Sequence, residues 1–288
     1  MDIQQPKTFC INLCEAVGYA NEDWRSLKQI IDETGAKAGI AKFDRVYIGY
    51  YVCENFFLGL TDSFYEAVGE LCWRYDMTAT LVVPIFGQAF LERGEKRLDD
   101  LMERYGSVCD ELVVNDIAMY FHASELYDIR IGLGRLMSKQ QRDARVRELM
   151  QRVEAPALSS EQKECLSDMR ANGMVPLMEF DPVCAALDAT QLKEEEPDLE
   201  LALHAPLCLA TTGRNCGAAS ATERDDSKFR LGQGCTHHCL RMRQGCKTKE
   251  GVNYLKHGRA YYFTNTSCEL RNVPDWRLVY AVAHETMR

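Results

Sequence analysis

"RVYIGYYVCENFFLGLTDSFYEAVGELCWRYDMTATLVVPI" (Arg45–Ile85) is the stretch that decides the fold. It opens with a short run rich in β-branched and aromatic residues, Arg45–Tyr50, and ends with a second apolar run, Ala79–Ile85. Between them, Thr61–Tyr75 repeats its apolar residues at helical spacing. A strand, a helix and a second strand in this order predict a βα unit, in which the two strands lie parallel in one sheet.

The same alternation continues in both directions along the chain. Six more segments have the composition of strands, which brings the expected number to about eight: Lys7–Asn12, Glu111–Asp116, Asp128–Gly134, Val175–Phe180, Glu200–Ala205 and Arg259–Thr264. Eight such units in 288 residues predict an α/β fold, a (β/α)8 barrel of the triosephosphate-isomerase type, either regular or distorted. An open doubly wound sheet is the alternative, but no glycine-rich dinucleotide fingerprint follows the first strand.

The domain organisation follows from where this periodicity is lost. We expect residues 1–288 to form a single barrel domain, with a Cys-rich insertion at residues 206–258. From Gly213 to Gly258 the sequence is rich in Gly, Cys and Arg and has no clear period. Loops of this length are rare without a function, so we expect a metal rather than a hydrophobic core to organise the insertion.

Composition limits the class of protein. With 46% hydrophobic residues the chain can bury a full core, and its net charge of −9 argues against nucleic acid as a partner. We find no signal peptide and no apolar run of the length that a membrane helix needs, so the sequence predicts a soluble, cytoplasmic protein.

The 13 cysteines are an odd number, and a reducing cytosol does not favour disulfides. We expect Cys72, Cys109, Cys165 and Cys184 to be ordinary small buried residues.

Functional residues of such barrels lie in the loops at the carboxyl ends of the strands. Eight candidate residues have this position: Cys53, Asn115, Asp116, Arg135, Glu179, Asp181, His204 and Cys208. The same barrel face should hold Cys53 and the Cys-rich insertion, so residues distant in sequence could bind one cofactor. Asn115, Asp116 and Arg135 are the residues that we expect to line an adjacent substrate pocket.

The insertion has one close cysteine pair, Cys235-x-x-x-Cys239, with Cys216 well upstream. This scattered spacing favours an iron–sulfur cluster held from several loops over a compact zinc site, with zinc and redox-active thiols as the alternatives. His237 and His238 do not have the spacing of a Rieske centre, and we expect them to be outside the ligand set.

The stretch Gly134–Arg152 is strongly basic in this acidic chain. It predicts either an amphipathic helix with a solvated basic face or a dock for an anionic ligand or acidic partner. Arg135 would contact such an anion, and Asp143 would orient a neighbouring arginine.

Five segments together resemble the family of collagenase-like peptidases of unknown catalytic type, peptidase family U32, and within it the single-domain UbiV branch. They are "VYIGYYVCENFF" (Val46–Phe57), "VVNDIAMYF" (Val113–Phe121), "GRLMSKQQRDAR" (Gly134–Arg145), "TTGRNC" (Thr211–Cys216) and "GCTHHC" (Gly234–Cys239). The resemblance implies a distorted barrel that carries a [4Fe–4S] cluster on four cysteines: Cys53, Cys216, Cys235 and Cys239.

The resemblance also implies a function. The UbiV branch acts in anaerobic ubiquinone biosynthesis as a heterodimer with a sister protein of UbiU type, and the pair supports oxygen-independent hydroxylation of a quinone precursor. Other relatives act in hydroxylation of RNA, and some are described as peptidases. A peptidase-type hydrolase and a non-catalytic zinc or iron–sulfur scaffold or sensor are therefore the alternative functions.

The chain departs from the branch's pattern in the ligand region, where Asn215 is additional and the interval between Cys216 and Cys235 is longer. The segment before Cys216 also resembles the UbiU branch, in which a cysteine at the position of Cys208 is a ligand. Cys208, Cys246 and Cys268 are alternative ligands for these reasons.

Overall fold

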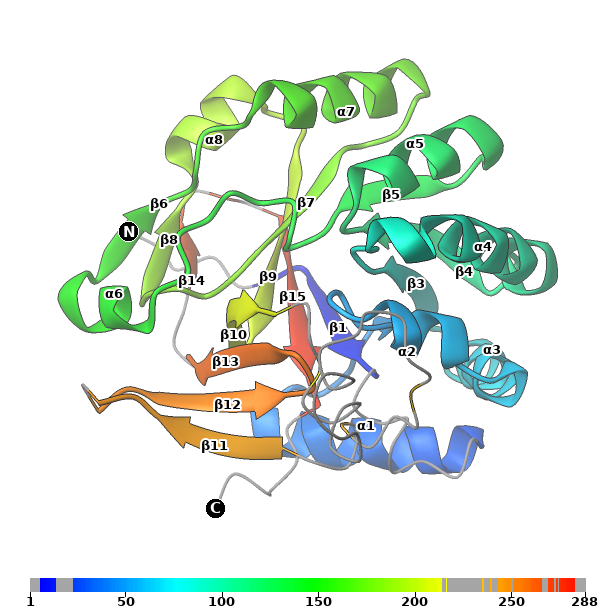
Figure 1. Ribbon diagram of the computed structural model, residues 1–288, viewed down its shortest axis with the longest axis horizontal. Helices are drawn as coiled ribbons and strands as arrows, with labels where there is room; N and C mark the ends of the chain where they lie inside the picture. Colours follow the sequence, from blue (N-terminus) through cyan, green and yellow to red (C-terminus); the bar gives the residue numbers. More distant parts are fainter. Residues whose placement is uncertain are drawn as a thin grey trace.

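The computed structural model describes residues 6–13, 23–213, 216, 235, 239, 243–249, 251–265, 269–271, 273 and 275–282. Eight parallel strands form a closed barrel in the order β1-β15-β9-β7-β5-β4-β3-β2 (Figure 1). Their bounds are β1 Thr8–Asn12, β2 Arg45–Ile48, β3 Thr78–Val83, β4 Cys109–Val114, β5 Arg130–Leu133, β7 Leu177–Phe180, β9 Glu200–Ala205 and β15 Trp276–Ala281. The expected α/β barrel of the triosephosphate-isomerase type is confirmed.

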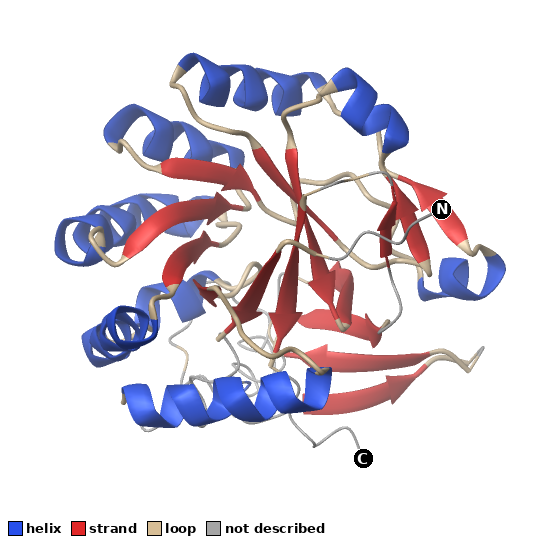
Figure 2. Cartoon of the chain, turned by 180° about the vertical axis from the view of Figure 1, so that it is seen from behind, coloured by secondary structure: helices blue, strands red, loops and turns tan. Residues whose placement is uncertain are grey.

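Helices surround the barrel between consecutive strands (Figure 2). They are α1 Trp24–Ala38, α2 Glu54–Gly59, α3 Asp62–Tyr75, the 3-10 turn η2 Gln88–Phe90, α4 Leu91–Tyr105, α5 Ile117–Leu126, α6 Ala144–Leu149, α7 Ser160–Ala171 and α8 Thr190–Glu195. None of the helices in the described part of the chain is long and apolar enough to cross a membrane.

Local sequence fixes where these helices begin and end. The carboxylate of Asp23 accepts hydrogen bonds from the backbone N–H groups of Arg25 and Ser26 at the start of α1. That helix ends at Gly39, whose φ of 69° lies in the left-handed region. Helix α7 begins with a capping box, in which Ser159 and Gln162 each bond the other's backbone N–H.

The eighth barrel strand is not the one that the sequence predicted. Arg259–Thr264 contains β13 (Ala260–Thr264), which belongs to a separate antiparallel sheet, and β15 closes the barrel between β1 and β9. The reason is that the consecutive residues Tyr262 and Phe263 of β13 are both buried, one on each face. Its sequence is therefore a continuous apolar run, as is typical of a strand in a parallel sheet.

The separate sheet has the order β10-β13-β12-β11, with β10 at Leu207–Thr212, β11 at Arg243–Lys247 and β12 at Asn253–His257. Its inner face joins the main core through Leu209, Leu255 and Tyr262, and its outer face packs Cys208 and Phe263 in a small second core. Of the segment Gly213–Gly258, the described Leu255 thus belongs to the main core, and the strands β10 and β13 that flank the segment pack on both faces. That a metal organises the segment stays a prediction.

Three short strands form a further parallel sheet in the order β14-β8-β6: β6 Arg152–Glu154, β8 Ala186–Asp188 and β14 Glu269–Arg271. The basic stretch 134–152 forms a turn, the six-residue helix α6 and the start of β6. It is therefore not one amphipathic helix, and the alternative, a dock for an anionic ligand or acidic partner, stays a prediction. Cys72, Cys109, Cys165 and Cys184 are buried, as expected of small apolar side chains.

Candidate functional site

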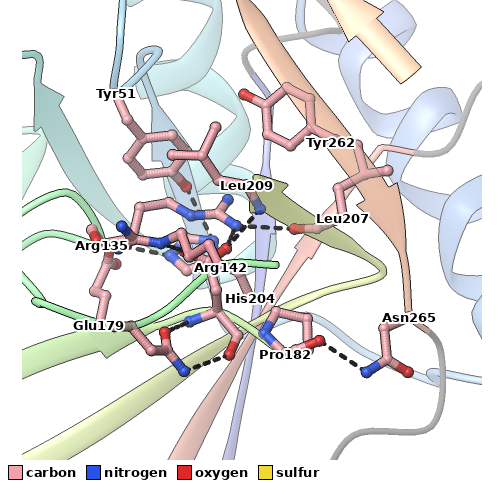
Figure 3. A network of polar contacts seen from close by, with 12 residues as sticks. Tyr51, Arg135, Arg142, Glu179, Pro182, His204, Leu207, Leu209, Tyr262 and Asn265 are labelled. Atoms are coloured by element: carbon pink, nitrogen blue, oxygen red, sulfur yellow. Dashed lines mark hydrogen bonds and ion pairs between the residues drawn. The ribbon is translucent and has the colours of Figure 1, made fainter. Parts of the chain in front are cut away.

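The carboxyl-terminal mouth of the barrel holds a group of buried charged side chains (Figure 3). Glu179 lies in β7, Asp181 directly follows this strand, and His204 lies in β9. Arg135 follows β5 and reaches the same point. All four are at most 3% exposed. The prediction that strand ends bring these residues together is confirmed by their contacts.

His204 joins two of the strand ends. Its Nε2 lies 2.9 Å from Oε2 of Glu179, and its Nδ1 lies 3.2 Å from the hydroxyl of Tyr51. A carboxylate only accepts hydrogen bonds, so Nε2 carries the proton and Nδ1 accepts from Tyr51. The hydroxyl of Tyr51 in turn accepts from Nδ2 of Asn12, at 2.7 Å. Burial, followed by the nearby guanidinium of Arg135, lowers the pKa of His204 to about 4, so the imidazole is neutral at pH 7.

Two guanidinium groups share the carboxylate of Asp181. Arg135 forms an ion pair with Oδ1, and Nε of Arg142 lies 2.7 Å from Oδ2. The backbone N–H of Leu209 also donates to Oδ1, at 2.8 Å, and Arg135 donates to the carbonyl of Leu207, at 2.9 Å. These bonds hold β10 across the barrel mouth, because they tie its backbone to residues that follow β5 and β7.

A small cavity of about 20 Å³ lies beneath β10, large enough for one water molecule or one polar group of a ligand. Its lining includes Asn12, Tyr50, Tyr51, Arg135 and His204. Nε of Arg135 has no hydrogen-bond partner among the described residues, although the atom is buried. The cavity is therefore a pocket with aromatic walls and a guanidinium donor.

Asn115 and Asp116 hold the neighbouring loops in place. Nδ2 of Asn115 donates to the carbonyl of Val83, at 3.1 Å, and its Oδ1 accepts from the N–H of Leu136, at 3.1 Å. Asp116 caps α5 by accepting from the N–H of Ala118, at 2.9 Å. Both side chains thus have structural bonds, and their contribution to a substrate pocket stays a prediction.

The four cysteines implied as cluster ligands are neighbours at the same mouth. The thiol of Cys239 has a hydrogen bond with Cys216 and electrostatic contacts with Cys53 and Cys235. Cys53 has an electrostatic contact with Cys216 as well. A loop that follows β2 and the segment that follows β10 thus meet, as the sequence analysis required.

Several residues enclose these thiols. Cys53 immediately precedes α2, and its N–H donates to the carbonyl of Tyr50, at 3.3 Å. Cys239 packs against Gly258, whose φ is +58°: a Cβ at this glycine would lie 3.5 Å from Cβ of Cys239 and 4.0 Å from the ring of Tyr50. Beside Cys53, the guanidinium of Arg259 pairs with the carboxylate of Glu54, at 2.6 Å.

The donor chemistry of this set fits an iron–sulfur cluster or zinc, since both bind sulfur. Burial raises the pKa of Cys53 to about 12, and the bond with Cys216, followed by burial, raises the pKa of Cys239. These thiols are protonated at neutral pH, so binding a metal would release protons. Among the described residues, no three His, Cys, Asp or Glu side chains are already spaced as ligands of one metal ion.

No family model matches the chain, and no curated protein matches it either. Solved structures with a similar fold include a type I 3-dehydroquinate dehydratase from Clostridium difficile, at 10% identity, with 75% of this chain and 82% of that chain covered and a TM-score of 0.36. The U32 peptidase Mk0906 is 11% identical over 99% of this chain and 96% of its own, with a TM-score of 0.41. A 7,8-dihydropteroate synthase from Vibrio fischeri is 13% identical over 69% and 73%, with a TM-score of 0.36. At these identities and scores the similarities say nothing about the chemistry of this chain.

The alternative ligands lie in other surroundings. Cys208 is fully buried in the second core, packed with Phe263 and its neighbours. Cys246 lies on β11 opposite Tyr254, and its thiol donates to the carbonyl of Gln244, at 3.7 Å. Cys268, His237 and His238 lie outside the described residues.

Sequence reasoning missed three members of the site: Asn12, Tyr51 and Arg142. Two of them could have been found by the rule used for the other candidates, namely a position at the carboxyl end of a strand. Asn12 ends the first strand, and Tyr51 follows the second. Arg142 could not have been found in this way, since it reaches Asp181 from a loop seven residues beyond Arg135.

Proposed function

We propose that this chain is a [4Fe–4S] protein of the U32 family, with its cluster on Cys53, Cys216, Cys235 and Cys239, and that it supports an oxygen-independent hydroxylation. By its resemblance to the UbiV branch, the substrate is a ubiquinone precursor, and the chain works in a heterodimer with a sister protein of UbiU type.

One observation carries the proposal: the thiol of Cys239 has a hydrogen bond with Cys216 and lies within electrostatic range of Cys53 and Cys235. Cys239 is buried and the other three cysteines are half-buried. A free cysteine packs as a small apolar side chain, so packing alone gives no reason to gather four of them in one place. Four of them collected from two distant segments are the arrangement that a cluster held by four thiolates requires.

The cavity beneath β10 adjoins the thiols through a shared wall. Tyr50 lines the cavity, and its ring also lies beside Gly258, the residue against which Cys239 packs. The hydroxyl of Tyr50 donates to the carbonyl of His257, at 3.0 Å, and accepts from Tyr262, at 3.0 Å, so this wall is fixed.

In this arrangement, a bound cluster would supply one-electron transfer, and the chain's own residues would bind the substrate. Nε of Arg135 is buried without a partner among the described residues, and Arg135 lines the cavity, so this N–H would donate to an oxygen of the substrate. Tyr51 and the neutral His204 would hold a proton beside that oxygen, while β10 excludes water.

A peptidase-type hydrolase is less well supported. Its nucleophile and base would be a Cys–His pair, and Cys208 with His204 at the end of β9 is the candidate pair. Both ring nitrogens of His204 are bonded to Glu179 and Tyr51, and Cys208 is buried in the second core, so neither group is presented for that chemistry.

The decisive experiment is purification without oxygen, followed by a visible spectrum and assays of iron and sulfide. We expect a brown protein with about four irons per chain. The Cys53→Ala variant should lose this colour, although residue 53 is far from the other cysteines in sequence. The matched control is Cys246→Ser, which changes a half-buried cysteine on β11 and should leave the colour and the iron content unchanged.

A colourless protein that contains zinc would overturn the proposed cofactor. If Cys53→Ala kept its iron while Cys246→Ser lost it, the cofactor would stand and the ligand set would be wrong. The heterodimer is tested separately, by co-expression with a UbiU-type protein and size-exclusion chromatography of the anaerobic mixture. Elution of the two chains as separate species would contradict the proposed partner.

A further inference from the structure

A second, larger groove lies on the outer face of the small sheet, away from the cavity beneath β10. It is bounded by β11, β12 and β13 on one side and by the segment 142–145 on the other, and its volume is about 560 Å³. This is within the range of pockets that bind small molecules, whereas the mouth cavity has room for one polar group.

Strand alternation explains the floor of this groove. Leu255 and Tyr262 point to the barrel, so Tyr254 and Tyr261, their neighbours in sequence, point outward. Tyr254 is fixed edge-on against Phe263, with ring centroids 6.4 Å apart, and both tyrosines line the groove. The floor therefore presents two partly exposed aromatic rings.

The charges along the groove are mainly positive. Arg142 and Arg145 lie on one side and Lys247 lies on β11, while Asp143 is the single carboxylate among the described residues of the lining. Asp143 forms a bidentate pair with Arg145, as the sequence analysis expected of its role toward a neighbouring arginine. A surplus of cations here contrasts with the net charge of −9 of the whole chain.

Arg142 is the buried member of this group, with its side chain 14% exposed. Burial and the neighbouring Arg135 lower its pKa to about 10, because the two guanidinium groups lie close together and share Asp181. An anion bound in the groove would offset the repulsion between the two groups.

We propose that this groove binds an aromatic anion, with its ring on Tyr254 and Tyr261 and its phosphate or carboxylate group between Arg145 and Lys247. Two features of the site support this ligand class: tyrosine rings offer faces for stacking, and guanidinium groups suit oxyanions. The inference does not depend on the cluster, because none of these residues belongs to the proposed ligand set.

The test is a ligand-observed NMR titration of the full chain with 4-methylumbelliferyl phosphate, and in parallel with 7-(carboxymethoxy)-4-methylcoumarin. We expect saturable binding of at least one of the two, and the comparison tells phosphate from carboxylate. Lys247→Ala should raise Kd about fivefold, the loss expected for one partly exposed charge contact. Tyr261→Leu should also raise Kd, because it keeps an apolar side chain but removes the ring.

Lys249→Ala is the matched control, since Lys249 is an exposed lysine of the same hairpin that does not line the groove. It should bind as the unmodified chain does. Equal binding of the uncharged 7-methoxy-4-methylcoumarin would overturn the proposal, as would an unchanged Kd in both Lys247→Ala and Tyr261→Leu. Displacement of the bound probe by a hexaglutamate peptide at concentrations below the probe's own Kd would assign the groove to an acidic chain instead.

Discussion

His204 is held between two partners that need opposite roles from it. Its protonated Nε2 donates to Glu179, and its bare Nδ1 accepts from Tyr51, so only the neutral imidazole satisfies both. With a second proton, Nδ1 could no longer accept the hydrogen bond from Tyr51, and the ring would carry a positive charge beside Arg135. Glu179, His204, Tyr51 and Asn12 form one chain of hydrogen bonds. The neutral state of His204 therefore determines which group donates and which accepts at each bond of this chain.

This residue makes stability depend on pH. The pKa of His204 is about 4 in the folded chain and about 6.5 when the chain is unfolded. The unfolded state therefore binds a proton more readily, and the stabilisation is complete above pH 6.5 and decreases as pH falls toward 4. The loss over this window should be roughly 3 kcal/mol. Urea unfolding at several pH values measures it.

His204→Gln is the variant that isolates this effect. Glutamine can donate to Glu179 and accept from Tyr51 but does not titrate in this window. We expect the variant to be less stable than the parent at pH 7.5 and to lose less of its stability between pH 6.5 and 4.5. Parallel pH profiles for the two proteins would show that His204 is not the titrating group.

At the scale of elements, strand ends could be predicted from the sequence and the closing strand could not. The rule that functional residues follow barrel strands needs only the strands' positions, and these are marked by local composition. It found Glu179 and His204, which contact each other, and Asp181, which pairs with Arg135. The partner of a strand is decided by long-range pairing, which composition does not contain. This is why β13, buried on both faces, was mistaken for the eighth barrel strand, while β15 includes the charged Arg277 and was overlooked.

For the cysteines too, burial on a single element could be predicted from the sequence, and the contact between distant segments could not. The burial of Cys72, Cys109 and Cys165 could be predicted, because a helix or strand face determines their surroundings, whereas Cys184 is buried in a bend between β7 and β8. The meeting of Cys53 with Cys239 depends on how a loop after β2 approaches the chain that follows β10, which only the closed barrel determines.

Helix α7 gives a prediction for a single element. The hydroxyl of Ser159 accepts from the N–H of Gln162, and the side chain of Gln162 accepts from the N–H of Ser159, at 2.6 Å. Ser159→Ala removes one half of this capping box and should cost about 1 kcal/mol of unfolding free energy. Ser160→Ala, one residue later on an exposed position of the same helix, should change stability little. Equal effects of both variants in chemical denaturation would contradict the role of the cap.

For the whole molecule, closure of the barrel places a charged cluster at its amino-terminal end. Glu111 of β4 is fully buried and accepts two hydrogen bonds from Arg277 of β15, at 2.8 and 2.9 Å. Arg130 of β5 and Arg45 of β2 lie 3.5 and 3.8 Å from the same carboxylate. One buried anion thus connects four strands from different parts of the barrel.

Glu111→Gln should destabilise the whole barrel, because it leaves three guanidinium groups around a neutral side chain. Removing one partner of a buried ion pair typically costs about 3–5 kcal/mol, since the remaining charge stays desolvated. The comparison variant is Asp110→Asn, which affects the neighbouring pair with Arg45, at 2.6 Å, on a side chain that is 51% exposed. A pair so exposed should contribute less than about 1 kcal/mol. Measured under one set of conditions, the loss of unfolding free energy should therefore be several-fold larger for Glu111→Gln than for Asp110→Asn. Equal losses would mean that the buried carboxylate does not hold the strands together and that apolar packing closes the barrel alone.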